Sequence, residues 1–163
     1  GTRLGADVAF FINGYGCAHG VGRGDILTQL PSLYGKWAVI LYPEILTPAH
    51  KTATIYSHLS EREFSDGSKV IDLIAALKTK IDVHSKHCSN VFSDRFITEI
   101  FPSVGEHIRI FMESGADHVT MSGTGPALYT LVDSEDQGRI LADLLIDKGF
   151  SAYSTPLVDR PND

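Results

Sequence analysis

Residues 118–157 read HVTMSGTGPALYTLVDSEDQGRILADLLIDKGFSAYSTPL, and they determine the fold class of the chain. The segment opens with two short runs of apolar and β-branched residues, at 118–121 and 128–132. The glycine-rich sequence SGTGP at 122–126 separates these runs. Runs of this kind on either side of a turn predict two neighbouring strands.

The second half of this segment predicts a helix and a last strand. Ser134 and Gln137 have the spacing of a capping box, in which the two side chains satisfy backbone N–H groups of the first helical turn. Apolar residues then recur at helical spacing as far as Gly149, a residue type that commonly ends helices. Residues 151–157 complete the pattern as a strand.

Two more helices and a buried strand are predicted upstream. The apolar spacing over 68–81 predicts an amphipathic helix. Another helix is expected to begin with a capping box at Ser103 and to end at Gly115. Its buried stripe is expected to consist of Ile108, Phe111 and Met112. The β-branched and aromatic run Trp37–Tyr42 predicts a buried strand.

Counted from Trp37, the expected order is strand, helices, strand, strand, helix, strand. This is the β-α-β-β-α-β order of the ferredoxin-like arrangement, with extra helices in its first crossover, so the predicted fold class is α+β. The sequence before Pro31 differs, because its apolar pieces, such as VAFFI at 8–12, are broken by glycines. We expect strands and turns there, and a domain boundary that separates residues 1–31 from 32–163.

Composition narrows the possible partners and compartments. A chain of 163 residues with 43% hydrophobic residues can bury a core, and its net charge of −6 disfavours nucleic acid as a partner. The apolar runs are shorter than a membrane span, so we expect no membrane partner. Cys17 and Cys88 lie far apart without a CxxC motif, and no signal-peptide pattern is present. These features predict a cytoplasmic location.

Two motifs are expected to carry no chemistry. The sequence HSKHC at 84–88 holds three possible metal ligands, but no second pair at short spacing completes a four-ligand site. We therefore expect no metal centre. The glycines between Gly14 and Gly24 do not match G-x-G-x-x-G, so a hairpin is favoured over a dinucleotide cradle.

Two other positions leave a choice open. Gly123, Thr124 and Gly125 allow backbone N–H groups and a hydroxyl to converge on an anion, although the residues alone favour a plain tight turn. Asp7 stands at the mouth of a segment expected to be buried, where a carboxylate could accept a proton from a substrate hydroxyl. A cap or turn aspartate is the alternative.

Four motifs occur together in a familiar order: LGADVAFF at 4–11, GRGDIL at 22–27, TATIY at 52–56 and MSGTGPALY at 121–129. In these motifs the chain resembles the galactokinase, homoserine kinase, mevalonate kinase and phosphomevalonate kinase (GHMP) superfamily. Within it, the chain is similar to the C-terminal portion of the kinases that act on a cytidine-diphosphate-linked methylerythritol. The resemblance covers nearly the whole chain and implies a role in non-mevalonate isoprenoid biosynthesis.

The resemblance implies ATP-dependent phosphorylation of the 2-hydroxyl of this CDP-linked substrate, with ATP and Mg²⁺ as cofactors. Asp7 matches the family's catalytic aspartate, which orients and deprotonates the hydroxyl. Thr52 matches a threonine of the substrate pocket, and Tyr56 matches the aromatic residue that stacks on cytosine. Gly123, Thr124 and Gly125 match a glycine-rich loop that supports the main phosphate-binding loop.

The resemblance also implies a missing partner. The family's main phosphate-binding loop, a catalytic lysine and most of the cytidine pocket belong to an N-terminal half that these residues do not match. Residues 1–31 are then a remnant of that domain, which carries the catalytic Asp7, and 32–163 form the C-terminal domain. We expect the isolated chain to be nearly inactive without that half in cis or in trans.

Two departures from the family pattern accompany the resemblance. Ala9 stands where the family usually has proline, and the segment before Thr52 is longer than the family pattern. Two alternatives therefore stay open. One is another small-molecule kinase of the superfamily, and the other is a non-catalytic ferredoxin-like ligand-binding or regulatory module.

Overall fold

The computed structural model describes residues 5, 7–33, 35–79, 81–95 and 97–158. Its central feature is an antiparallel four-stranded sheet with the order β4-β5-β3-β6. The strands are β3 (Trp37–Tyr42), β4 (Thr120–Met121), β5 (Leu128–Val132) and β6 (Ser151–Pro156). The first and third of these strands in chain order lie in the centre of the sheet. This is the ferredoxin-like arrangement, so the predicted fold class is confirmed.

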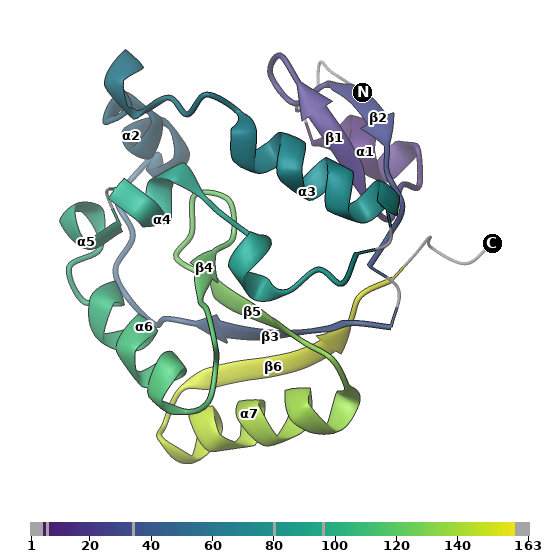
Figure 1. Cartoon of the computed structure of the whole chain (residues 1–163). Coiled ribbons are helices and arrows are strands. Elements are labelled where there is room, and N and C mark those ends of the chain that lie inside the picture. Colours follow the sequence, from purple (N-terminus) through teal and green to yellow (C-terminus); the bar gives the residue numbers. More distant parts are fainter. Residues whose placement is uncertain (1–4, 6, 34, 80, 96, 159–163) are drawn as a thin grey trace.

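Most helices lie in the connection between β3 and β4 (Figure 1). This connection contains α2 (Lys51–Ser57), α3 (Ser68–Thr79), α4 (Val91–Arg95), α5 (Ile97–Ile100) and α6 (Val104–Glu113), with short 3₁₀ turns η1 (Glu61–Glu63) and η2 (Ser85–His87). The second connection is shorter and holds α7 (Glu135–Asp147), which packs along β6 and β3 at the bottom of Figure 1. The extra helices of the first crossover are therefore present as predicted.

The main core lies between the sheet and the helices that cover it. Fully buried side chains come from β3, β5, α6 and α7, and include Leu41, Leu128, Phe111 and Leu145. Met112, which was predicted to be buried, is exposed instead, and so are Ile140 and Leu144 of the apolar series in α7. Each adjoins a buried position of its helix, where the apolar pattern is wider than the stripe that faces the core.

Of the two predicted capping boxes, the one at Ser134 is partly formed and the one at Ser103 is not formed. Ser134 Oγ accepts a hydrogen bond from Gln137 N at 3.3 Å, while Gln137 Oε1 accepts from Asp133 N at 3.0 Å, one residue earlier than the motif requires. The box at Ser103 is wrong. Ser103 has helical dihedral angles, φ −77° and ψ −13°, and makes no capping bond with its side chain, because the chain already turns at Phe101.

The prediction of a buried strand-like segment after Asp7 is also wrong. Val8–Ile12 forms the short helix α1, which contains no buried residue. Asp7 O accepts a hydrogen bond from Phe10 N at 3.1 Å and so starts the turn. A continuous apolar run of this length does not separate helix from strand by its periodicity, which explains the error.

The glycine-rich segment that follows forms the predicted hairpin. β1 (Ala18–Val21) pairs with β2 (Ile26–Gln29), and the connecting loop has positive φ angles of 66° at Gly22 and 85° at Gly24. The hairpin lies beside α3 in Figure 1. A second apolar cluster joins this region to α3 and the segment after it, through Leu30, Ala76, Leu77 and Val83.

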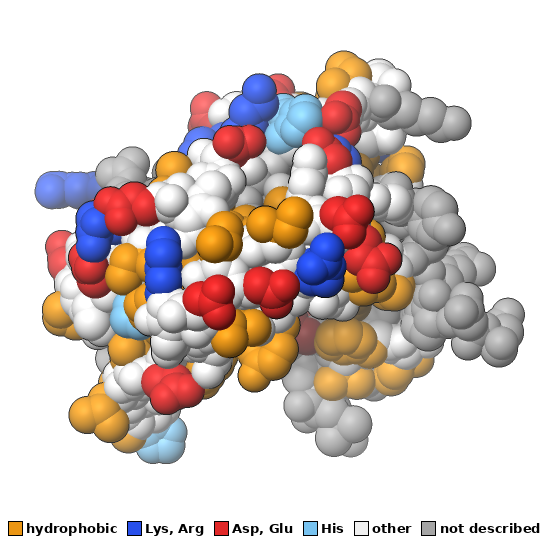
Figure 2. Space-filling view, turned by 90° about the horizontal axis from the view of Figure 1, so that it is seen from below, with side chains coloured by type: hydrophobic (Ala, Val, Ile, Leu, Met, Phe, Trp, Pro, Cys, Tyr) orange, Lys and Arg blue, Asp and Glu red, His pale blue; other side chains and the backbone are white. Residues whose placement is uncertain are grey.

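The face that carries α7 is mixed in character (Figure 2). Arg139 forms ion pairs with Asp136 at 3.3 Å and Asp143 at 3.8 Å, and the exposed Ile140 and Leu144 lie on the same helix. Among the residues that the structure describes, no helix combines the length and the apolar character needed to cross a bilayer.

Candidate functional site

The loop at 122–126 closes as a tight turn between β4 and β5. Ser122 N donates to Ala127 O at 2.9 Å, and Gly125 N donates to Ser122 O at 2.8 Å. Gly123 and Gly125 have φ angles of 53° and 65°, which residues with a side chain rarely adopt. A Cβ at Gly125 would lie 2.1 Å from the sulfur of the buried Met121, so the loop approaches its own strand too closely for a side chain there.

Two backbone donors of this loop are left available. In the described part of the chain, the N–H groups of Gly123 and Thr124 donate to no protein acceptor. The Thr124 hydroxyl lies beside them and is partly exposed. The loop therefore combines features that suit a phosphate-binding turn, namely free N–H groups, a hydroxyl and no side chain at Gly123, where a Cβ would point into open space.

Helix α2 brings two further residues to the loop. Lys51 Nζ donates to the carbonyl oxygen of Gly125, and Thr52 Oγ1 lies 3.5 Å from Thr124 Oγ1. Thr52 and Thr124 belong to two motifs that are about 70 residues apart in the sequence, and they meet here. Lys51 was not among the predicted site residues, although its position directly before Thr52 is the signal that could have found it.

Asn90 holds the loop from the other side. Its Nδ2 donates to Met121 O at 2.9 Å and to Gly123 O at 2.7 Å, while its Oδ1 accepts from Phe92 N at 3.0 Å at the start of α4. Sequence reasoning missed Asn90, because nothing in the local sequence indicates that a residue before a short helix contacts a turn some 30 residues later.

Tyr56 lies on the exposed side of α2. Its side chain is 57% exposed, whereas the neighbouring Ile55 is buried in the core. The Tyr56 ring packs edge-on against Phe92 with 5.1 Å between ring centroids. Phe92 is buried, so it supports the Tyr56 ring from within the protein. Tyr56 is thus not the core residue that an amphipathic helix alone would place there.

Asp7 lies in a different part of the molecule. It is exposed, directly precedes α1, and makes no capping bond with its side chain. Figure 1 shows α1 next to the hairpin, whereas the loop between β4 and β5 lies next to α4. No contact joins Asp7 to residues 122–126 within the described ranges. Its catalytic role stays a prediction.

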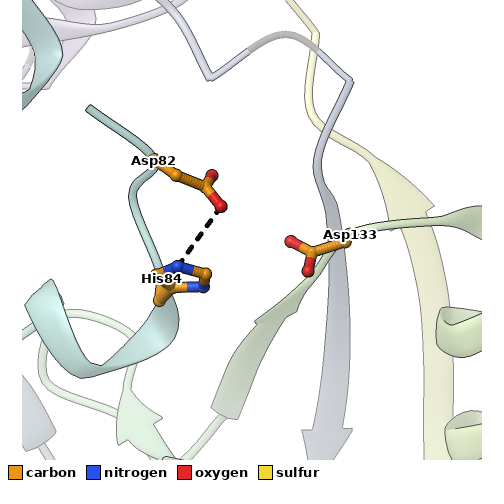
Figure 3. A group of neighbouring side chains, drawn as sticks. All are labelled: Asp82, His84 and Asp133. Carbon is orange, nitrogen blue, oxygen red and sulfur yellow. Dashed lines mark ion pairs between the residues drawn. The ribbon is translucent and has the colours of Figure 1, made fainter. Parts of the chain in front are cut away.

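A group of acidic and imidazole side chains lies beside the 3₁₀ turn η2 (Figure 3). The ligand atoms of Asp82, His84 and Asp133 all lie within 4.8 Å of one another. Lys36 Nζ is 2.5 Å from a carboxylate oxygen of Asp82 and 2.5 Å from one of Asp133. Its ammonium thus supplies positive charge to both carboxylates, and its hydrogen bond holds the pKa of Asp82 below the usual range.

The other potential ligands of the HSKHC sequence are used locally. His87 Nδ1 accepts from His84 N at 3.0 Å. Burial raises the pKa of the Cys88 thiol, and the same cause raises the pKa of the neighbouring Tyr129 hydroxyl.

Known proteins share much of the sequence of this chain. Residues 74–149 match a family model described as GHMP kinases C terminal. A protein of Dehalococcoides mccartyi named 4-diphosphocytidyl-2-C-methyl-D-erythritol kinase is 36% identical over 156 residues, which cover 94% of this chain and 53% of that protein. A protein of Geobacillus kaustophilus with the same name is 31% identical over 138 residues, which cover 84% of this chain and 46% of that protein.

Solved structures give the same result for the fold. The crystal structure of a 4-(cytidine 5'-diphospho)-2C-methyl-D-erythritol kinase superposes with a TM-score of 0.73 at 26% identity, covering 94% of this chain and 53% of that one. A homoserine kinase from Cytophaga hutchinsonii has a TM-score of 0.62 at 16% identity over 83% of this chain and 46% of its own, and it supports the fold alone. The chain spans about half the length of the curated relatives it matches.

Proposed function

We propose, from the premise that this chain carries a GHMP kinase C-terminal domain, that it forms one wall of the active site of a kinase that transfers phosphate from ATP to a small alcohol. The observation that carries this proposal is the meeting of Thr52 and Thr124 at a loop whose free N–H groups suit a phosphate. Relatives that are 36% and 31% identical to this chain are named as kinases.

The alcohol we propose is 4-diphosphocytidyl-2-C-methyl-D-erythritol, phosphorylated at its 2-hydroxyl in isoprenoid biosynthesis in the cytoplasm. The names of the relatives at 36% and 31% identity support this choice. Tyr56 also supports it, because its exposed ring, backed by Phe92, can stack on the cytosine base. Such stacking contributes about 1–3 kcal/mol to binding.

In this proposal each site residue has a separate task. Asp7 holds the 2-hydroxyl in line with the γ-phosphate of ATP and accepts its proton during transfer. The loop of Gly123, Thr124 and Gly125 faces the phosphates through the free N–H groups of Gly123 and Thr124 and the Thr124 hydroxyl. Thr52 lies at the boundary between the phosphates and the alcohol. The Mg²⁺ that accompanies ATP neutralises phosphate charge.

The second wall of the site is proposed to come from an N-terminal half, in cis or in trans. Phe11 is 74% exposed and Ile26 is 64% exposed, on α1 and β2 respectively. Large apolar side chains exposed in one region of a chain are typical of a surface that another protein segment covers. An N-terminal half seated there would bring its own phosphate-binding loop opposite this chain.

The test is a phosphoryl-transfer assay with the 163-residue chain, alone and mixed with the N-terminal half of the Dehalococcoides mccartyi relative. We expect almost no transfer with the chain alone and ATP-dependent transfer to the CDP-linked alcohol in the mixture. Homoserine and mevalonate serve as competing alcohols. Transfer to one of these instead would select another kinase of the superfamily. Binding of a ligand without transfer in any mixture would indicate a non-catalytic module.

A further inference from the structure

We propose that Asn90 is a positioning residue that sets the direction of the free Thr124 N–H group in the loop at 122–126. This inference rests on the proposed function, because it concerns how that loop presents itself to phosphate. Asn90 touches no reacting atom, and it acts through the backbone that it holds.

Both the nitrogen and the oxygen of the Asn90 side-chain amide form hydrogen bonds. Both bonds from Nδ2 go to backbone carbonyls, those of Met121 and Gly123, at 2.9 and 2.7 Å. Oδ1 accepts the Phe92 N–H at 3.0 Å, so the amide cannot turn without leaving one of three backbone groups unpaired. The backbone of Asn90 is fixed as well, since Ser93 Oγ donates to its carbonyl oxygen at 3.0 Å and lies 3.2 Å from Thr120 Oγ1 on β4.

These bonds determine where the neighbouring N–H groups point. In a trans peptide the C=O and N–H groups lie on opposite sides of the chain. The Met121 carbonyl points toward Asn90, and the Ser122 N–H on the same peptide accordingly points away, to Ala127 O at 2.9 Å. The Gly123 carbonyl also points toward Asn90. The Thr124 N–H is therefore directed away from Asn90, and it has no acceptor within the described residues.

Holding this direction matters because the loop could otherwise change it. Gly123 populates positive and negative φ with similar ease, so the Gly123–Thr124 peptide could rotate and turn its N–H inward. An anion site is effective when its donors already point at the ligand before it arrives. Lys51 cannot replace Asn90 in this task. Its bond reaches the Gly125 carbonyl, and the next residue, Pro126, has no N–H to direct.

Two substitutions separate this task from the support of α4. Asn90→Asp keeps an acceptor for the Phe92 N–H but places a carboxylate oxygen against two carbonyls. Asn90→Ser keeps a good capping residue while its short side chain cannot reach both carbonyls. Gln137→Glu on α7 is the matched control. It also changes a side-chain amide to a carboxyl, and it keeps an oxygen that can accept the hydrogen bond from Asp133 N.

The first measurement uses the ¹⁵N-labelled full chain without ligand. Both Asn90 variants are expected to move the backbone amide signals of Gly123 and Thr124 and to change their hydrogen exchange, while Gln137→Glu leaves them in place. Unchanged signals in both Asn90 variants would overturn the inference, whether or not the chain proves to be a kinase. If Asn90→Asp does not fold, Asn90→Ser decides the outcome.

The second measurement uses the mixture with the N-terminal half. Loss of the preset direction of the Thr124 N–H predicts a fall in kcat of roughly tenfold or more in both Asn90 variants, with KM for the alcohol within about twofold of the parent chain. A lowered melting temperature with unchanged kcat and KM would reduce Asn90 to a structural residue and refute the positioning role. If the mixture with the parent chain transfers no phosphate, the proposed function is refuted. The amide signals of the isolated chain would still test the positioning role of Asn90.

Discussion

The loop at 122–126 and the segment from Asp7 to Gln29 differ in how completely this chain holds them. Three residues contact the loop, Asn90 before α4 and Lys51 and Thr52 on α2, and the N–H groups that they leave free are those that a ligand would use. The N-terminal segment exposes Phe11 and Ile26 and leaves the Asp7 carboxylate without a capping bond. One region is organised by its own contacts, and the other exposes large apolar side chains that the proposed N-terminal half would cover.

This difference leads to an expectation about the conformational entropy that each region loses on binding. A loop that is ordered before its ligand arrives does not lose conformational entropy on binding, whereas a segment with little burial must be ordered by its partner. Variants in the loop should therefore alter the chain on its own. Variants at Asp7 should leave the stability of the isolated chain unchanged, and their effect should be seen only when the N-terminal half is added.

The largest effect is expected for Asp7→Asn. In the mixture with the N-terminal half it should lower kcat by about 10²–10⁴, because a positioned base contributes a factor of this size. The melting temperature of the isolated chain should not change, since Asp7 is exposed and its side chain makes no capping bond. A phosphoryl-transfer assay of the mixture measures kcat, and thermal unfolding of the isolated chain measures the melting temperature. Full activity in Asp7→Asn would remove this residue from the site.

A matched pair of alanine substitutions tests how tightly the loop is built. Gly123→Ala has open space for a Cβ but a φ of 53°, and should cost about 1–2 kcal/mol of stability. Gly125→Ala adds a clash with Met121, and should cost about 1–3 kcal/mol more. Denaturant unfolding of the isolated chain gives both values. Equal costs would mean that Met121 can move aside and that the loop is less tightly packed than it is in the structure.

Tyr56 shares a feature with each region of the comparison, because it lies on α2, the helix that contacts the loop, but its side chain is largely exposed. Tyr56→Ala should raise the KM for the cytidine-linked alcohol by the equivalent of about 1–3 kcal/mol, while Tyr56→Phe keeps the ring and should leave KM nearly unchanged. Steady-state kinetics in the mixture measure both. An equal rise in the two variants would assign the effect to the hydroxyl and contradict base stacking.

The sequence predicted the sheet better than it predicted the site. β3 and β5 have the predicted bounds, Trp37–Tyr42 and Leu128–Val132, because a buried strand between turn residues has a distinct local pattern. The apolar run VAFFI at 8–12 has no such pattern, and it forms a helix instead of the expected strand. Local composition cannot separate these two outcomes when the run is short.

The site was predicted only where the sequence carried a motif. Thr52 and Thr124 were candidates from two motifs, and the structure places them side by side. Lys51 and Asn90 make stronger contacts with the loop, yet neither belongs to a motif. Their importance arises from the packing of α2 and α4 around one turn, which is a property of the tertiary structure and not of any local stretch.

The smallest effect is expected at the ion pairs beside η2, which also belong to the part of the chain that is organised by its own contacts. Burial alone would lower the pKa of Lys36, but its bonds to Asp133 and Asp82 outweigh burial and raise it. For Asp82 the Lys36 bond lowers the pKa, so its stabilising contribution is complete well above the unperturbed value of about 3.9 and is lost as the pH falls through the lower folded value.

Asp82→Asn should therefore lower the melting temperature slightly at neutral pH. Its effect should shrink as the pH falls from about 4 through the lower folded pKa of Asp82, where the folded parent chain also loses this charge. Asp117→Asn is the control, because Asp117 is exposed and has no ion-pair partner within the described ranges. Thermal unfolding between neutral and acid pH measures the difference. A difference between the Asp82 variant and the parent that stays constant across this range would mean that the Lys36 contact contributes nothing through charge.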